Sequence, residues 1–132
     1  MSTSYVEFRG KGFWSCDRYL EDVLWVLAGT AIADGDIEWL RTARQHWLTQ
    51  ASGIFSGWVH PKLEEFLVTE DRQRVFFELT DAALCRDDLP PEARATLHLL
   101  IALIRGELGT DASSPLNYMV SGQLPYRGLR RE

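Results

Sequence analysis

The stretch PPEARATLHLLIALIRGELG, residues 90–109, decides the fold that the sequence predicts. Its opening proline pair suits the first turn of a helix, and Gly109 is typical of a helix end. Between residues 97 and 104 only His98 is polar, so this helix is expected to be apolar on nearly every side. Such a helix packs at the centre of a bundle, where we expect His98 to be a hydrogen-bonded core histidine.

Apolar residues recur at helical spacing in four further segments before this one. The predicted helices cover about residues 15–33, 36–51, 61–68 and 70–85. Thr69 precedes the last of these and is a suitable N-cap. The tryptophans that fall on or near the apolar stripes are assigned to the core: Trp25, Trp39 and Trp47.

A short β element completes the predicted fold. Residues 3–8 alternate loosely between polar and apolar and favour a strand, which needs a partner because a lone strand forms no sheet. Residues 118–121 are the predicted partner, which would bring the two termini together. We therefore expect a mainly α fold, a compact bundle of about five helices with a small two-stranded β element from the N- and C-terminal segments. Its single domain, 1–132, divides into strand and turn (1–14), helical core (15–109) and extended C-terminal segment (110–132).

Composition places the chain among ordinary globular domains, with 45% apolar and 25% charged residues. Cys16 and Cys85 are expected to be reduced thiols, although the sequence also allows one bridge between them. No basic start leads into an apolar stretch, and the longest apolar run, residues 99–104, is far shorter than a membrane span. A cytoplasmic location is expected, without membrane association.

The charge is concentrated in one part of the chain. The net charge is −5, and residues 60–92 alone hold nine acidic and four basic side chains, a balance of −5. An acidic surface disfavours nucleic acid, whose phosphates require Lys and Arg, and favours a basic protein partner. The predicted partner-binding residues are Glu64, Glu65, Glu70, Asp71, Asp87, Asp88 and Trp58, the last because a Gly-rich loop can expose it as an interface anchor.

The sequence contains no motif that indicates catalysis, a cofactor or a metal. No two histidines are three or four residues apart, and neither cysteine belongs to a C-x-x-C pair. Residues 53–57 read G-x-x-S-G, which is not the order of a hydrolase nucleophile elbow. The glycines around Lys11 lack phosphate-loop spacing, so a plain turn is the favoured interpretation. We predict a protein that is not an enzyme and binds no cofactor.

The opening YVEFRGKGFW, residues 5–14, is followed by an acidic helix. In this start, its small size, its acidity and its lack of catalytic motifs, the chain resembles immunity proteins of bacterial toxin–immunity systems. The resemblance implies that the partner is a toxin domain, often a basic nuclease, whose phosphate-binding surface the carboxylates would occupy. It also implies neutralisation of that toxin through the acidic surface.

Two other functions stay open at this stage. A helical domain can bind a small molecule or act as an enzyme through an aromatic-lined pocket, for which the candidate lining residues are Trp39, Trp47, Phe76 and His98. Alternatively, the chain is a regulatory or structural subunit of a homo-oligomer. A homodimer would then form by strand addition at an unpaired edge of residues 4–8.

Overall fold

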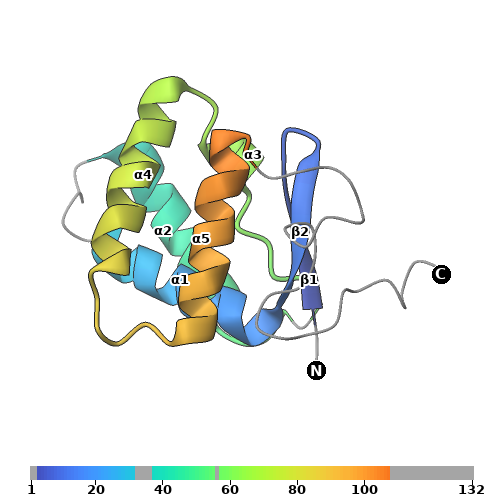
Figure 1. Ribbon diagram of the computed structural model, residues 1–132. Coiled ribbons are helices and arrows are strands. Elements are labelled where there is room, and N and C mark those ends of the chain that lie inside the picture. The colour runs from blue at the N-terminus through green and yellow to red at the C-terminus, as the bar shows by residue number, and fades with distance from the viewer. Residues whose placement is uncertain (1–2, 32–36, 56, 108–132) are drawn as a thin grey trace.

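The computed structural model describes residues 3–31, 37–55 and 57–107. In this part of the chain a β-hairpin precedes five helices (Figure 1). The elements are β1 (Thr3–Phe8), β2 (Lys11–Cys16), α1 (Asp17–Thr30), α2 (Glu38–Gln50), α3 (Leu63–Phe66), α4 (Glu70–Leu84) and α5 (Pro91–Arg105). The predicted mainly helical fold with a small two-stranded sheet is confirmed.

The partner of β1 differs from the predicted one. β1 pairs with β2 in antiparallel register, and Arg9 and Gly10 form the turn between them with φ values of 53° and 83°. Two successive left-handed residues match a two-residue hairpin turn. The strand predicted at residues 118–121 lies outside the described residues. The expected start of the first helix at residue 15 is wrong, because β2 continues to residue 16 and α1 begins after it.

Gly12 explains why the second strand was not predicted. The sequence predicted a turn at this position, but Gly12 lies inside β2 opposite Glu7. The space next to it is filled by the ring of Tyr5, and a Cβ at position 12 would collide with that ring and with the Val6 carbonyl oxygen. The glycine therefore marks a close approach within the hairpin.

The central helix is α1. It packs against α2, α4, α5 and β2, and its apolar stripe, which includes Leu20, Leu24 and Leu27, is fully buried. The prediction that the last helix is central is wrong, and so is the prediction for His98, which is exposed on α5. α5 also ends earlier than expected, because Gly106 takes the left-handed conformation, with φ 76°, that stops a helix.

The tryptophans divide between core and surface. Trp47 on α2 is fully buried, with its ring edge-on to Phe76 at a centroid distance of 6.2 Å. Trp39 is half-buried, so its assignment holds only in part. Trp25 was wrongly assigned to the core and is 62% exposed, because it follows the buried Leu24 by one position and so points about 100° away from that stripe.

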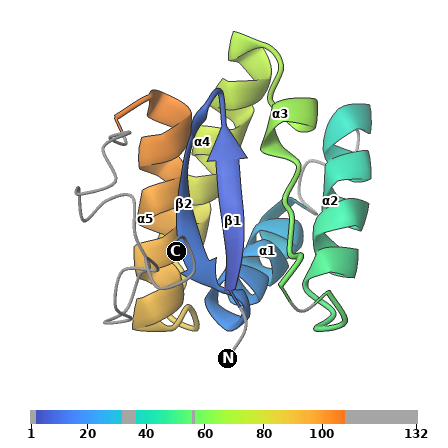
Figure 2. The ribbon, with the colours of Figure 1, turned by 90° about the vertical axis from the view of Figure 1, so that its right-hand side faces the viewer.

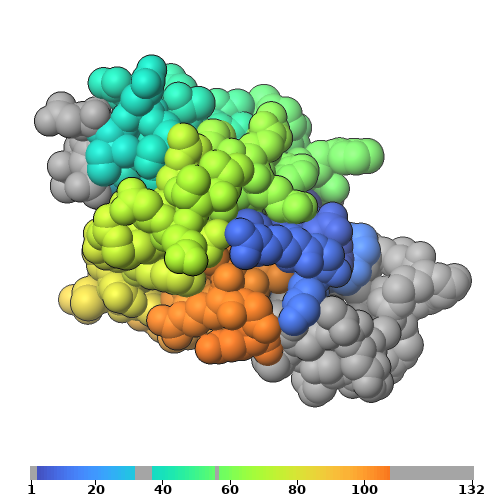
Figure 3. Space-filling model, turned by 90° about the horizontal axis from the view of Figure 1, so that it is seen from above, coloured from blue at the N-terminus to red at the C-terminus, as the bar shows by residue number. Residues whose placement is uncertain are grey.

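One segment joins the hairpin to the helices. After α2 the chain returns along β1 and reaches α3, so residues 57–62 lie between β1 and α2 (Figure 2). Seen from above, α4 lies between α2 and α5, and the hairpin lies beside α4 and α5 (Figure 3). The predicted helix over residues 61–68 is shortened to the single turn α3, because Lys62 before it takes the left-handed conformation, with φ 54° and ψ 46°.

We expect Trp47→Phe to lower the free energy of unfolding by about 2–4 kcal/mol. The indole Nε1–H of Trp47 donates to the buried Pro61 carbonyl at 3.0 Å, and phenylalanine removes that donor and leaves a void. Urea denaturation measures the change. Trp25→Phe is the matched control on the surface and should change stability by less than about 0.5 kcal/mol. Equal effects at the two positions would contradict this account of the core.

Candidate functional site

A buried carboxylate holds one side of the segment 57–61. Asp17, the first residue of α1, accepts the Ser4 hydroxyl at 2.5 Å and the Gly57 backbone N–H at 2.5 Å. The Ser4 oxygen in turn accepts the Val59 N–H at 3.0 Å. Since Ser4 and Asp17 are both buried, these charge-assisted hydrogen bonds are shielded from water. The network ties β1, α1 and the segment together.

Three side chains of α2 hold the other side of this segment. The Nε2–H of His46 donates to the His60 carbonyl at 2.6 Å, and Trp47 donates to the carbonyl of Pro61. The Gln50 side-chain oxygen accepts the His60 N–H at 2.8 Å. Side chains thus supply the hydrogen bonds that a neighbouring strand would otherwise supply to an extended backbone.

Trp58 lies in the middle of this fastened segment and points outward. Its side chain is 80% exposed, whereas Val59 next to it is fully buried. The sequence allowed either loop packing or exposure for Trp58, and the structure shows exposure. Large aromatic side chains on a fixed backbone lose little freedom on binding, which makes them effective interface anchors.

A pocket of about 340 Å³ opens beside Trp58. Its aromatic walls come from β1, β2 and the loop, namely Tyr5, Trp14 and Trp58. The rings of Tyr5 and Trp14 face each other across the hairpin with centroids 5.1 Å apart. Sequence analysis missed Tyr5 as a site residue, although the alternation of residues 3–8 already placed it on the face opposite Val6.

The surroundings of Tyr5 and His46 shift the pKa values of both side chains. Burial, and secondly the Glu7 carboxylate, raise the pKa of Tyr5 above its usual value, so its phenol stays neutral and able to donate at physiological pH. Burial lowers the pKa of His46, an effect that its hydrogen bond to the His60 carbonyl opposes. The His46 side chain that donates to the His60 carbonyl is therefore a neutral imidazole near pH 7.

The six predicted acidic residues do not form one patch. Glu64 and Glu65 are on α3 and Glu70 and Asp71 open α4, whereas Asp87 and Asp88 follow the far end of α4. Since α4 has 15 residues, the two groups are roughly 20 Å apart. Asp71 and Asp88 also differ from the other predicted residues because each pairs with an arginine. Arg74 lies 2.6 Å from Asp71, and Arg86 lies 2.7 Å from Asp88.

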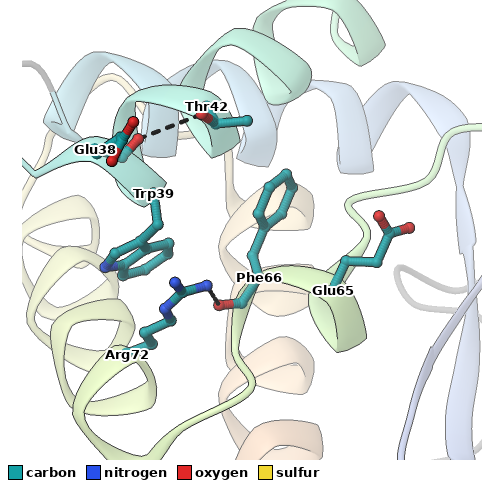
Figure 4. A pocket seen from close by; sticks show the side chains of 6 residues that line it. All are labelled: Glu38, Trp39, Thr42, Glu65, Phe66 and Arg72. Carbon is teal, nitrogen blue, oxygen red and sulfur yellow. Dashed lines mark hydrogen bonds between the residues drawn. The ribbon is translucent and has the colours of Figure 1, made fainter.

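A second hollow of about 480 Å³ lies between α2, α3 and the start of α4 (Figure 4). Its floor contains Trp39, with the Arg72 guanidinium 5.1 Å from the ring centroid. Arg72 also donates to the Phe66 carbonyl at 3.2 Å, and the carboxylates of Glu38 and Glu65 lie at the rim. The arginine is already engaged, so the hollow offers carboxylates without an available cation among its lining residues.

The alternative aromatic-lined pocket is not assembled. Trp47 and Phe76 pack against each other in the core, Trp39 lines the second hollow, and His98 is exposed on α5. Both cysteines are free thiols, Cys16 buried and Cys85 exposed. Among the described residues there is no group of three metal-ligating side chains, and none of the described helices has the length and apolarity to span a bilayer.

Comparison with protein-family models, with curated proteins and with solved structures finds no match to this chain.

We expect Asp17→Asn to lower the free energy of unfolding by about 2 kcal/mol at neutral pH. The amide keeps the size of the side chain, but its NH₂ group meets either the Ser4 hydroxyl or the Gly57 N–H and leaves one buried donor unpaired. Thermal or urea unfolding measures the loss. Amide hydrogen exchange at Gly57 and Val59 should accelerate as well, because their acceptors are weakened.

The matched control is Asp22→Asn, the same change five residues further along α1. Burial raises the pKa of Asp22, which the neighbouring Arg18 partly offsets. A raised carboxyl pKa means that folding favours the protonated form, so the charge destabilises the fold above that pKa and the effect disappears below the ordinary aspartate pKa. The control should therefore leave stability unchanged or raise it at pH 7. Equal losses for both variants would refute the special role of Asp17.

Proposed function

We propose that this chain is a protein-binding protein whose interface centres on the Trp58 face, defined as β1 together with residues 57–61. The observation that carries the proposal is the exposed Trp58 on a backbone that Asp17 and α2 hold from both sides. Binding energy in protein interfaces concentrates in such aromatic anchors, particularly Trp and Tyr. Because the segment is already ordered, little conformational entropy is lost on association.

The charge around this face supports a basic partner. The chain continues from the fastened segment directly into α3, which packs on β1 and carries the exposed Glu64 and Glu65 (Figure 2). Rim carboxylates accelerate encounter with a positively charged surface and reject an acidic one. The proposal includes Glu70 and Asp71 in this rim and omits Asp87 and Asp88, which lie at the far end of α4.

In its most specific form, we propose that the protein is an immunity protein that neutralises a toxin domain in the cytoplasm. The support for this form is its likeness to such proteins in size, acidity and lack of catalytic motifs. Carboxylates at the rim would occupy the basic surface with which a nuclease holds phosphates. The Trp58 anchor would add affinity that does not depend on salt.

We expect Trp58→Ala to weaken binding of the partner at least about 30-fold, the effect of losing a central anchor worth about 2 kcal/mol. The partner is first isolated with the tagged wild-type chain from its native host, and dissociation constants are then measured with both proteins purified. Trp25→Ala removes another exposed tryptophan, on α1, and should leave the affinity unchanged. If both variants bind like the wild type, the Trp58 face is not the interface.

The immunity form adds a cellular readout with the same variants. The isolated partner, expressed alone, should stop growth, and coexpression of wild type or Trp25→Ala should restore it, whereas Trp58→Ala should protect poorly. A partner that binds through Trp58 but never affects growth would overturn the immunity form and leave the binding proposal standing.

Charge reversal tests the rim separately. We expect Glu64→Lys combined with Glu65→Lys to slow association with a basic partner about tenfold at low salt, with a smaller effect at high salt, because screening weakens steering. Asp81→Lys combined with Asp87→Lys makes the same charge change near the far end of α4 and should act weakly. Stopped-flow association rates give the comparison. Identical slowing by both pairs would show that only net charge matters.

A further inference from the structure

We propose that the pocket beside Trp58 receives an arginine side chain of the partner, with the guanidinium against the aromatic rings of Trp58 and Tyr5. The inference rests on the proposed function and names the group that the interface recognises. It follows from the chemistry of the pocket walls, from the charges nearby and from the way this protein packs its own arginines.

The pocket walls offer aromatic faces and no charge. Besides its aromatic side chains the pocket is lined by Ser4, Gly57, Val59 and His60, and no Lys, Arg, Asp or Glu is among the described lining residues. The Ser4 oxygen is already occupied by the Val59 N–H and by Asp17. An occupant of this pocket therefore gains little from hydrogen bonds and much from contact with ring faces, whose negative electrostatic potential attracts cations.

The carboxylates of Asp17 and Glu7 make the pocket attractive to a cation, and Asp17 is the nearer of the two, because it is hydrogen-bonded to the lining residues Ser4 and Gly57. Glu7 is two residues from Tyr5 on the exposed face of β1, and its cross-strand neighbour is Gly12, which has no side chain to pair with it. Its influence reaches the ring, since it contributes to the raised pKa of Tyr5. An anionic occupant would be repelled by both carboxylates.

Arginine fits these walls better than lysine. A guanidinium is planar, weakly hydrated and able to stack on a ring, whereas an ammonium keeps its hydration shell. The described residues show this arrangement at Arg9 over Phe8, Arg72 over Trp39 and Arg105 over Phe77, with the guanidinium carbon 5.0–5.2 Å from each ring centroid. The methylene stem of the arginine would contact the apolar lining.

The test uses three capped tripeptides with glycine on both sides of arginine, citrulline or leucine. Citrulline matches arginine in shape but carries no charge. Binding to the full chain is followed by NMR through the amide shifts of Gly57 and Val59. We expect the arginine peptide to bind with about fivefold higher affinity than the citrulline peptide, and the advantage to shrink with added salt.

Two variants separate ring chemistry from simple apolar contact. Trp58→Leu keeps an apolar side chain but removes the ring face, so the preference for arginine over citrulline should disappear, whereas Trp25→Leu should retain it. Glu7→Gln should reduce the preference by about half, because a nearby charge is lost but the rings remain. All three replaced positions are exposed, and circular dichroism checks that the fold persists.

Each outcome decides the inference. Preference for arginine that depends on Trp58 supports it. Equal binding of citrulline or leucine, or no shift at Gly57 and Val59 with any peptide, overturns it. The proposed function is decided independently by the affinity of Trp58→Ala for the intact partner, so a pocket that accepts a leucine would refute the arginine while leaving the interface in place.

Discussion

The buried carboxylate of Asp17 is the interaction on which the arrangement of the Trp58 face depends. It joins a strand, the start of the central helix and a loop that comes 40 residues later, through hydrogen bonds to Ser4 and Gly57. A buried charge is tolerated only where it is paired or well hydrogen-bonded. Its position in the first turn of α1 helps, because the positive end of the helix dipole stabilises a negative charge there.

The same constraint gives the segment 57–61 its rigidity without placing it in a sheet. An extended backbone outside a sheet needs partners for its N–H and C=O groups, and here Asp17 and Ser4 supply them on one side while α2 supplies them on the other. Trp47 and Gln50 follow His46 by one and four residues on α2. Successive turns of this helix therefore reach two adjacent residues of the segment, His60 and Pro61. The result is a rigid segment that carries the exposed Trp58, and its rigidity comes from hydrogen bonds to the core.

The helices could be predicted from the sequence because their signals are local. Apolar spacing, the proline at the start of α5 and the Thr69 cap, which accepts the Arg72 N–H at 3.1 Å, all act within a few residues. The second strand could not be predicted, because the sequence does not distinguish a glycine that permits the close approach of Tyr5 within a strand from a glycine that forms a turn. For the same reason Gly109 was predicted to end the last helix, whereas α5 ends at Gly106.

The site was predictable only in part, since its contacts join residues distant in sequence. The exposure of Trp58 followed from its Gly-rich loop, but the residues that fix it, Ser4 and Asp17, carry no local signal of that role. The acidic cluster showed the opposite problem. Residues 60–92 carry nine acidic against four basic side chains. One long helix separates the two ends of this segment, and arginines pair with Asp71 and Asp88, so the sequence overstated how closely the acidic residues gather in space.

Two features of the surface, its carboxylates and its aromatic pocket, therefore have different roles in the proposed interface. Exposed ion pairs contribute little to stability, and a paired carboxylate contributes less to the long-range field than a carboxylate without a cation beside it. Among the described residues no ion pair engages Glu7, Glu64 or Glu70, and Glu7 lies on the same face of β1 as Tyr5 of the aromatic pocket. In the proposed interface, the field of these carboxylates would affect how fast a charged surface approaches, because it extends about a Debye length. The pocket beside Trp58 would act only on contact and would select the side chain that stays bound.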